Sequence, residues 1–163
     1  LQPAFDYVND VANAHLTLCC RREEWEKVKA GYKIGNAAVT IVHASGEDLQ
    51  KLYKAADIFV ILRENHEYLS FAMPVKVFET LAHGLPILTL EGSETARFVK
   101  AEQVGWVISS REEFKHLLQN LETNPKLLTS MRQHVWRAAE KHTWQARALQ
   151  VVKTLETYKV GLK

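Results

Sequence analysis

Two short apolar runs constrain the fold of this chain more than any other feature: residues 58–62 (IFVIL) and 85–90 (LPILTL). Apolar residues occupy successive positions in each run, as in strands that are buried on both faces of a parallel sheet. Amphipathic stretches with helical spacing separate such runs along the chain. This alternation predicts the α/β class, with a doubly wound, mostly parallel Rossmann-like sheet.

The same patterns predict the order of the elements. We expect strands at residues 15–20, 39–43, 58–62, 85–90 and 106–108, and helices at 2–13, 22–32, 46–56, 74–83 and 94–100. A C-terminal helical tail follows, because Ser110 and Glu113 form a capping box and Asn124–Pro125 supplies an N-cap followed by proline. Thr143 is expected to cap a last helix that reaches Tyr158.

Length and composition limit the classes of function. The 163 residues suit one compact domain. The 21 basic and 19 acidic side chains nearly balance, which argues against nucleic acid as a partner. No apolar run approaches the roughly 18 residues that a membrane-spanning helix needs. Because the chain starts with Leu1 and not with Met, we expect it to be part of a longer protein.

The two cysteines, Cys19 and Cys20, are adjacent in a predicted strand. Neighbouring side chains of a strand point to opposite faces, so this pair is poorly placed to form a disulfide. Unbridged core cysteines are typical of a reducing compartment, and we expect a cytoplasmic protein. We also expect Trp106, Trp136 and Trp144 to be packing residues.

The segment 63–73 is the strongest candidate for a binding loop. In an open α/β sheet, ligands bind beyond the carboxyl ends of the strands, and this segment follows one buried strand there. It leads into the helix that starts at Pro74, whose N-terminus would attract anions through its free N–H groups and its dipole. Arg63 and Lys76 would add two cations at the same place. The arrangement suits a diphosphate.

The helix at 74–83 has an apolar face and a polar face. The residues expected to pack on the sheet are Val75, Val77, Phe78, Leu81 and Ala82. The opposite face carries Lys76, Glu79, Thr80 and His83, which follow spacings of three, four and seven. On this face Glu79 could accept both hydroxyls of a ribose. The alternative is an ordinary exposed ion pair of about 0.3–0.5 kcal/mol, which the pattern alone favours.

The stretch ADIFVILRENHEYLSFAMPVKVFETLAHGLPIL resembles the donor-binding segment of GT-B glycosyltransferases of the group 1, family 4-like branch. That branch carries Pro-x-Lys-x-x-Glu followed by Gly-x-Pro, and the matching residues here are Pro74, Lys76, Glu79, Gly84 and Pro86. The flanks are similar too, so that the resemblance spans residues 39–158. It implies that residues 1–163 form a single nucleotide-sugar-binding domain, the C-terminal half of a GT-B enzyme. The N-terminal acceptor domain would then lie outside this chain.

The resemblance also implies roles for individual residues. Glu79 would hold the ribose of a nucleotide diphosphate sugar. Arg63 and Lys76 would be the catalytic residues, because they would stabilise the departing diphosphate.

Neighbouring loops would supply the remaining donor contacts. The amides near Ala72 and Met73 would face the phosphates together with Lys76. The loop that begins at His43 and Ala44 would lie against the base, largely through its backbone.

Three departures from the family pattern are visible. Phe71 stands where many relatives have a second glutamate, eight residues before Glu79, so a carboxylate role at the donor sugar does not carry over to it. Thr80 stands where many relatives have tyrosine. The usual first strand and its phosphate-binding loop have no counterpart in the chain.

The expected activity is transfer of a sugar from a nucleotide diphosphate sugar to an acceptor hydroxyl, in glycan or polysaccharide biosynthesis. No metal or other cofactor is expected, because protein cations can neutralise the diphosphate. The expected partners are the nucleotide sugar, the N-terminal domain of the same protein, and a glycan or lipid-linked acceptor. Peripheral membrane association of the full-length protein is left open. The alternatives are a GT-B sugar-nucleotide epimerase and a non-catalytic α/β interaction module.

Overall fold

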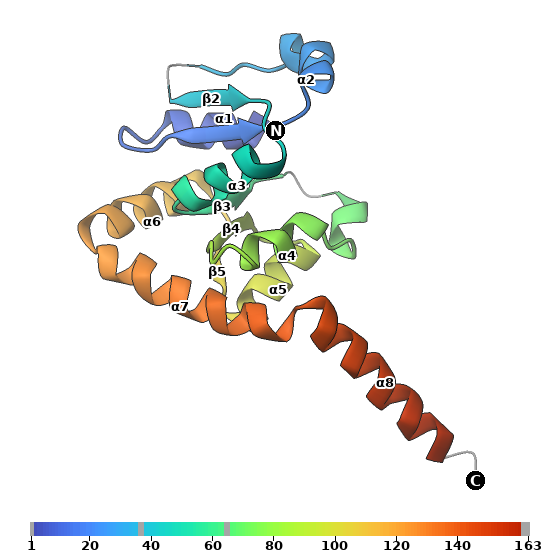
Figure 1. The fold of residues 1–163 in the computed structure, drawn as a ribbon. Helices are drawn as coiled ribbons and strands as arrows, with labels where there is room; N and C mark the ends of the chain where they lie inside the picture. Colours follow the sequence, from blue (N-terminus) through green and yellow to red (C-terminus); the bar gives the residue numbers. More distant parts are fainter. Residues whose placement is uncertain (1, 36–37, 64–65, 161–163) are drawn as a thin grey trace.

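The computed structural model describes residues 2–35, 38–63 and 66–160 (Figure 1). The strands are β1 (Leu16–Cys19), β2 (Val39–Val42), β3 (Phe59–Ile61), β4 (Ile87–Leu90) and β5 (Gly105–Ile108). The helices are α1 (Gln2–Asn9), α2 (Arg22–Val28), α3 (Gly46–Ala55), α4 (Val75–Leu81), α5 (Glu94–Glu102), α6 (Arg111–Thr123), α7 (Pro125–Lys141) and α8 (Trp144–Val160). Two 3-10 turns, η1 (Lys29–Gly31) and η2 (Glu67–Ser70), complete the order. The predicted α/β class and helical tail are confirmed.

All strand pairs are parallel, and the strands divide into two sheets. β1 pairs with β2, and β4 lies between β3 and β5. The predicted parallel pairing is therefore confirmed, while the described residues form two sheets and not one continuous sheet. The two sheets share one core, because Leu16 of β1 and Val60 of β3 pack on the same apolar cluster.

The three-stranded sheet is buried on both faces. On one face, α4, α5 and α7 supply a cluster built around Val77, Val99 and Val135, and Ile87 of β4 joins it. On the other face, α1 and α6 contribute to a second cluster, and Leu88 of β4 joins that one. Neighbouring strand residues point to opposite faces, so β4 contributes to both cores. The apolar run 85–90 predicted this double burial, whereas β3, formed by the run 58–62, is only half-buried.

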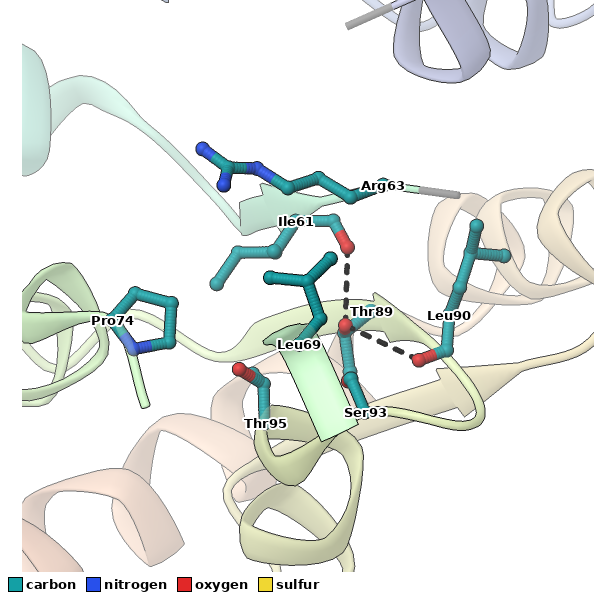
Figure 2. A pocket seen from close by; sticks show the side chains of 8 residues that line it. All are labelled: Ile61, Arg63, Leu69, Pro74, Thr89, Leu90, Ser93 and Thr95. Carbon is teal, nitrogen blue, oxygen red and sulfur yellow. Dashed lines mark hydrogen bonds between the residues drawn. The ribbon is translucent and has the colours of Figure 1, made fainter. Parts of the chain in front are cut away.

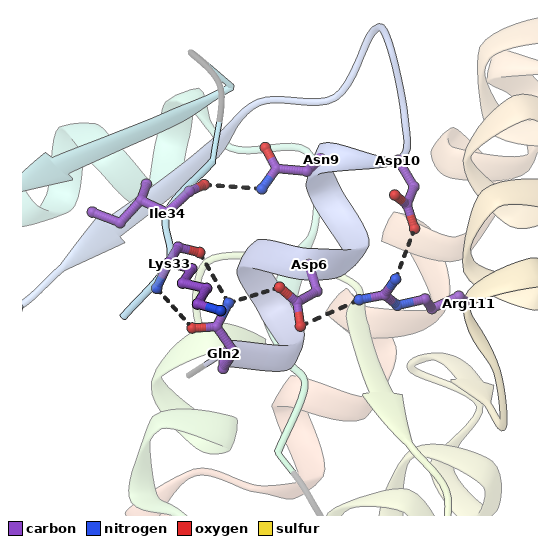
Figure 3. Close-up of polar contacts among 7 residues, drawn as sticks. All are labelled: Gln2, Asp6, Asn9, Asp10, Lys33, Ile34 and Arg111. Atoms are coloured by element: carbon purple, nitrogen blue, oxygen red, sulfur yellow. Dashed lines mark hydrogen bonds and ion pairs between the residues drawn. The ribbon is translucent and has the colours of Figure 1, made fainter. Parts of the chain in front are cut away.

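Polar contacts around α1 connect the segment before β2 with the start of α6 (Figure 3). The contacts are those of Gln2 with Lys33 at 2.9 Å, Asn9 with Ile34 at 2.9 Å, and Arg111 with Asp6 at 3.2 Å and Asp10 at 3.4 Å. One end of this set lies in the segment before β2 and the other at the start of α6. Helix α1 thereby ties the two-stranded sheet to the tail. It ends at Asn9, earlier than the predicted residue 13.

The two faces of α4 differ in part from the prediction. Val77 and Leu81 are buried as expected. Val75 is 66% exposed, because it is the first residue of the helix. Thr80, expected on the polar face, is fully buried. Its hydroxyl donates to the Lys76 carbonyl at 2.6 Å, which satisfies the polar group inside the core.

Helix α8 projects away from the body (Figure 1), and its Trp144 is 84% exposed. The prediction that Trp144 packs in the protein is therefore wrong for the described chain. Near the start of α8, the Arg147 guanidinium lies 4.6 Å from the centre of the Phe78 ring. In the part of the chain that the structure describes, no helix combines the length and apolar character needed to cross a membrane. Cys19 and Cys20 are free thiols, as predicted.

Gly84 ends α4 with a left-handed backbone, φ +66°, and lies beneath Trp136 of α7. A Cβ added at Gly84 would come within 2.4–2.6 Å of the Trp136 ring. We predict that Gly84→Ala lowers the free energy of unfolding by about 1–3 kcal/mol from the backbone conformation alone. The ring contact should add to this loss. Denaturant unfolding measures the change.

Gly31→Ala is the matched control. A Cβ at Gly31 would meet no atom of the described residues within 4 Å. Its effect should stay within about 0.5 kcal/mol, the usual range for an open surface position. Equal effects of the two substitutions would contradict the packing of Trp136 on Gly84.

Candidate functional site

A pocket opens at the carboxyl ends of β3 and β4 (Figure 2). Its lining residues are Ile61, Arg63, Leu69, Pro74, Thr89, Leu90, Ser93 and Thr95. The Thr89 hydroxyl donates to the Ile61 carbonyl at 3.0 Å and so joins the two strand ends. Arg63, a member of the predicted site, thus lines a pocket at the predicted edge of the sheet together with Pro74, the first residue of the family motif. Lys76 and Glu79 are not among the lining residues.

Lys76 and Glu79 lie one turn apart on α4 and form an ion pair. Lys76 Nζ donates to Glu79 Oε2 at 2.6 Å, with 56% of the lysine and 42% of the glutamate side chain exposed. The pair therefore matches the ordinary exposed ion pair that the pattern favoured. An exposed pair of this kind contributes about 0.3–0.5 kcal/mol to stability.

A third residue, Tyr53 of α3, donates its hydroxyl to the same Glu79 oxygen at 3.4 Å. Tyr53 is buried, with its ring stacked on His83 at 4.4 Å between centres. We call Tyr53, Lys76, Glu79 and His83 the Glu79 cluster. No spacing rule connects Tyr53 to Glu79, 26 residues further along the chain.

The electrostatics of the cluster keep both donors protonated. The hydrogen bond to Glu79 raises the pKa of Lys76. Burial raises the pKa of Tyr53, and the Glu79 charge adds to that increase while Lys76 opposes it. A small further increase of both pKa values comes from Cys19, so the end of β1 belongs to the surroundings of the cluster.

The start of α4 offers fewer free amides than the sequence suggested. The Ala72 N–H donates to the Tyr68 carbonyl at 3.0 Å, so a phosphate would have to displace that bond. The Met73 side chain packs against the core beneath α4. Pro74 is the N-cap and makes no side-chain cap hydrogen bond, and the Val77 N–H donates to its carbonyl at 3.0 Å. The amides of Val75 and Lys76 are therefore the ones left for water or a ligand.

His43 and Ala44 connect the ends of β1 and β2. A ring nitrogen of His43, Nδ1, lies 2.9 Å from the Cys20 carbonyl, and the Cys19 thiol lies 3.5 Å from the Ala44 carbonyl. The exposed His43 therefore has a structural contact on one side of its ring. Contact between this loop and the base of a nucleotide stays a prediction.

Phe71, which occupies the position of the absent glutamate, is an exposed aromatic residue of the loop before α4. Its ring meets Tyr68 edge-on at 5.5 Å between centres. Arg97 of α5 donates to the Ser70 carbonyl and holds this loop against the helix. Within residues 2–35, 38–63 and 66–160, no three His, Cys, Asp or Glu side chains come close enough to bind a metal ion.

A parallel α/β fold with polar residues at the carboxyl ends of its strands defines a class of ligand-binding domains. The sequence matches the family model described as "Glycosyl transferase-like" over residues 4–153, so the chain belongs to this family. A search of curated proteins finds no match.

Among solved structures, the chain is similar to the crystal structure of WaaG, a glycosyltransferase involved in lipopolysaccharide biosynthesis. The TM-score is 0.65 at 17% sequence identity, with 86% of this chain and 39% of the WaaG chain covered. The likeness confirms the predicted GT-B glycosyltransferase fold. The chain spans well under half the length of that protein.

Alkaline pH is expected to weaken the domain through the Glu79 cluster. The folded state raises the pKa of both Tyr53 and Lys76, so it favours their protonated forms. This contribution is complete below the unfolded-state values of about 10 and is lost as the pH rises above them. Tyr53→Phe should make the alkaline loss of stability shallower. Denaturant unfolding at a series of pH values measures it, and a loss identical to that of the wild type would contradict the pKa shift.

Proposed function

We propose that this chain is the nucleotide-sugar-binding domain of a glycosyltransferase, which transfers a sugar from a nucleotide diphosphate sugar to an acceptor hydroxyl. Membership of the glycosyltransferase-like family supports the reaction class. The Lys76–Glu79 pair on α4, the helix whose N-cap Pro74 lines the pocket at the carboxyl ends of β3 and β4, supports the donor site. In the reaction, the acceptor oxygen bonds to the anomeric carbon and gives up its proton. The bond from that carbon to the diphosphate breaks, and the diphosphate leaves with the electron pair.

The observation that carries this proposal is the hydrogen bonding of Glu79. Its Oε2 accepts from Lys76 and Tyr53, whereas Oε1 has no donor among the residues that the structure describes. An exposed carboxylate oxygen is a strong acceptor for hydroxyl groups. We assign Oε1 to the ribose hydroxyls of the donor.

The diphosphate would lie between the start of α4 and Arg63. Lys76 is half exposed, and its flexible side chain can turn the ammonium group from Glu79 toward a phosphate. Arg63 lines the neighbouring pocket with Pro74, the N-cap of α4. These two cations would stabilise the charge that develops on the leaving diphosphate, without a metal ion. His43 and Ala44 would border the base.

The acceptor would bind to a second domain of the same protein. The coverage of 39% of the WaaG chain supports such a division, because more than half of that structure has no counterpart here. We assign the acceptor to glycans or lipid-linked glycans, and the full-length protein to the cytoplasm or the cytoplasmic membrane surface. A glycan biosynthetic role accords with the stated involvement of WaaG in lipopolysaccharide biosynthesis.

Glu79→Gln is predicted to weaken nucleotide binding with little effect on stability. A thermal-shift screen of UDP, GDP, ADP and their sugars with the full-length protein first identifies the donor. Calorimetry with that nucleotide should then show a loss of about 1.5–3 kcal/mol, the scale for a hydrogen bond to a charged group. The free energy of unfolding should change by no more than about 0.5 kcal/mol.

Glu26→Gln is a matched control, because Glu26 also pairs with a lysine three residues away, Lys29, at 2.6 Å and with similar exposure. It should leave binding unchanged. Unchanged affinity in both variants would rule out the ribose role of Glu79. Failure of the wild type to bind any nucleotide would favour the non-catalytic module, and an altered free nucleotide sugar formed without acceptor would favour the epimerase.

Residues 1–163 alone are predicted to bind the donor weakly and to transfer no sugar. The reason is that the proposed acceptor site lies on another domain. Transfer from the radiolabelled donor sugar to acceptor, compared between residues 1–163 and the full-length protein, measures the difference. Comparable turnover by both would overturn the two-domain proposal.

A further inference from the structure

Tyr53 is a buried residue whose single polar side-chain atom points out of the core. The side chain is 8% exposed, and its hydroxyl lies 3.4 Å from Glu79 Oε2. The residue belongs to α3, which precedes β3, whereas Glu79 belongs to α4, which follows β3. The contact therefore joins two helices across an intervening strand and loop.

The two donors on Glu79 Oε2 differ in rigidity. Lys76 reaches the oxygen at 2.6 Å through a flexible, half-exposed chain that can turn elsewhere. Tyr53 has a rigid aromatic side chain that is buried, so few alternative rotamers are open to it. When Lys76 shifts toward a phosphate, Tyr53 is the donor that stays in place.

The ring of Tyr53 is held from two sides. His83 stacks on it with 4.4 Å between centres and 12° between planes, and Phe59 of β3 approaches it at 6.4 Å. His83 lies in the turn that directly follows α4, four residues after Glu79. The segment that carries the carboxylate, α4 and the turn after it, therefore also supports the ring whose hydroxyl meets that carboxylate.

We propose that Tyr53 is a positioning residue for Glu79: its hydroxyl holds Oε2 so that Oε1 faces the ribose hydroxyls of the donor nucleotide. This inference rests on the proposed function and adds to it a residue that touches no ligand. The distance of 3.4 Å is long for a hydroxyl donor, as catalytic hydrogen bonds often are before a ligand binds. Ribose bound at Oε1 would tighten the contact.

Burial supports this role, because it raises the pKa of Tyr53 and so keeps the hydroxyl protonated. A deprotonated tyrosine would repel the carboxylate. The donor function is thus preserved throughout the neutral and mildly alkaline range.

Ribose preference is the measurement that separates positioning from packing. It is the ratio of the dissociation constants of the 2′,3′-dideoxy nucleotide and the ordinary nucleotide, determined by calorimetry on the full-length protein. The probes are UDP, GDP and ADP with their dideoxy forms, and the nucleotide that binds most tightly is used with its dideoxy form.

Tyr53→Phe keeps the ring and its contacts with His83 and Phe59 and removes only the hydroxyl. It should lower the ribose preference about five-fold, the size expected for one hydrogen bond, with the thermal midpoint nearly unchanged.

Tyr7→Phe is the matched control, because Tyr7 packs on Phe114 at 5.5 Å on the opposite side of the sheet. It should leave the ribose preference unchanged. A ribose preference that Glu79→Gln abolishes and Tyr53→Phe leaves intact would overturn this inference while the proposed function stands. A wild-type protein that binds none of the three nucleotides would overturn both.

Discussion

The burial of the three-stranded sheet on both faces is the constraint on which the rest of the structure depends. Ile87 and Leu88 are neighbours on β4, both fully buried, and they enter different apolar clusters. Helices must cover each face, and α4 is one of them. Because α4 follows β3, its first turn lies at the carboxyl edge of the sheet. Lys76, in that first turn, therefore lies where the core ends.

Apolar runs predicted the strands and the order of the helices, since two-sided burial leaves a direct mark on the sequence. The faces of α4 were predicted less well. Helical spacing treats every turn alike, but α4 has only seven residues and its first turn lies at the end of the helix, so Val75 is exposed. Thr80 is buried because a carbonyl one turn back accepts its hydroxyl, a local solution that polarity patterns do not register. Trp144 was expected to pack because its side chain is large and apolar. Whether such a side chain is buried depends on the tertiary structure, and in the described chain Trp144 is exposed.

The candidate site was predictable to the extent that it is local. Lys76 and Glu79 meet because residues three apart on a helix are neighbours, and Arg63 and Pro74 meet because both flank one loop. The contact of Tyr53 with Glu79 depends on how α3 and α4 sit side by side. Long-range contacts of this kind leave no periodic signal in a single sequence. The occupied amide of Ala72 was equally invisible, because it follows from the short turn η2.

The distinction between a surface ion pair and a binding carboxylate turns on the third residue. Lys76 alone would make Glu79 an ordinary exposed pair that contributes little to stability. Burying a hydroxyl costs free energy unless it is hydrogen-bonded, and at 3.4 Å the bond of Tyr53 to Glu79 recovers only part of that cost. The contact is therefore weak as a stabilising interaction. What it does provide is direction, since a carboxylate held through one oxygen from the protein side keeps its other oxygen turned outward. A ligand hydroxyl on that oxygen would complete the hydrogen bonding that the described protein groups leave unfinished.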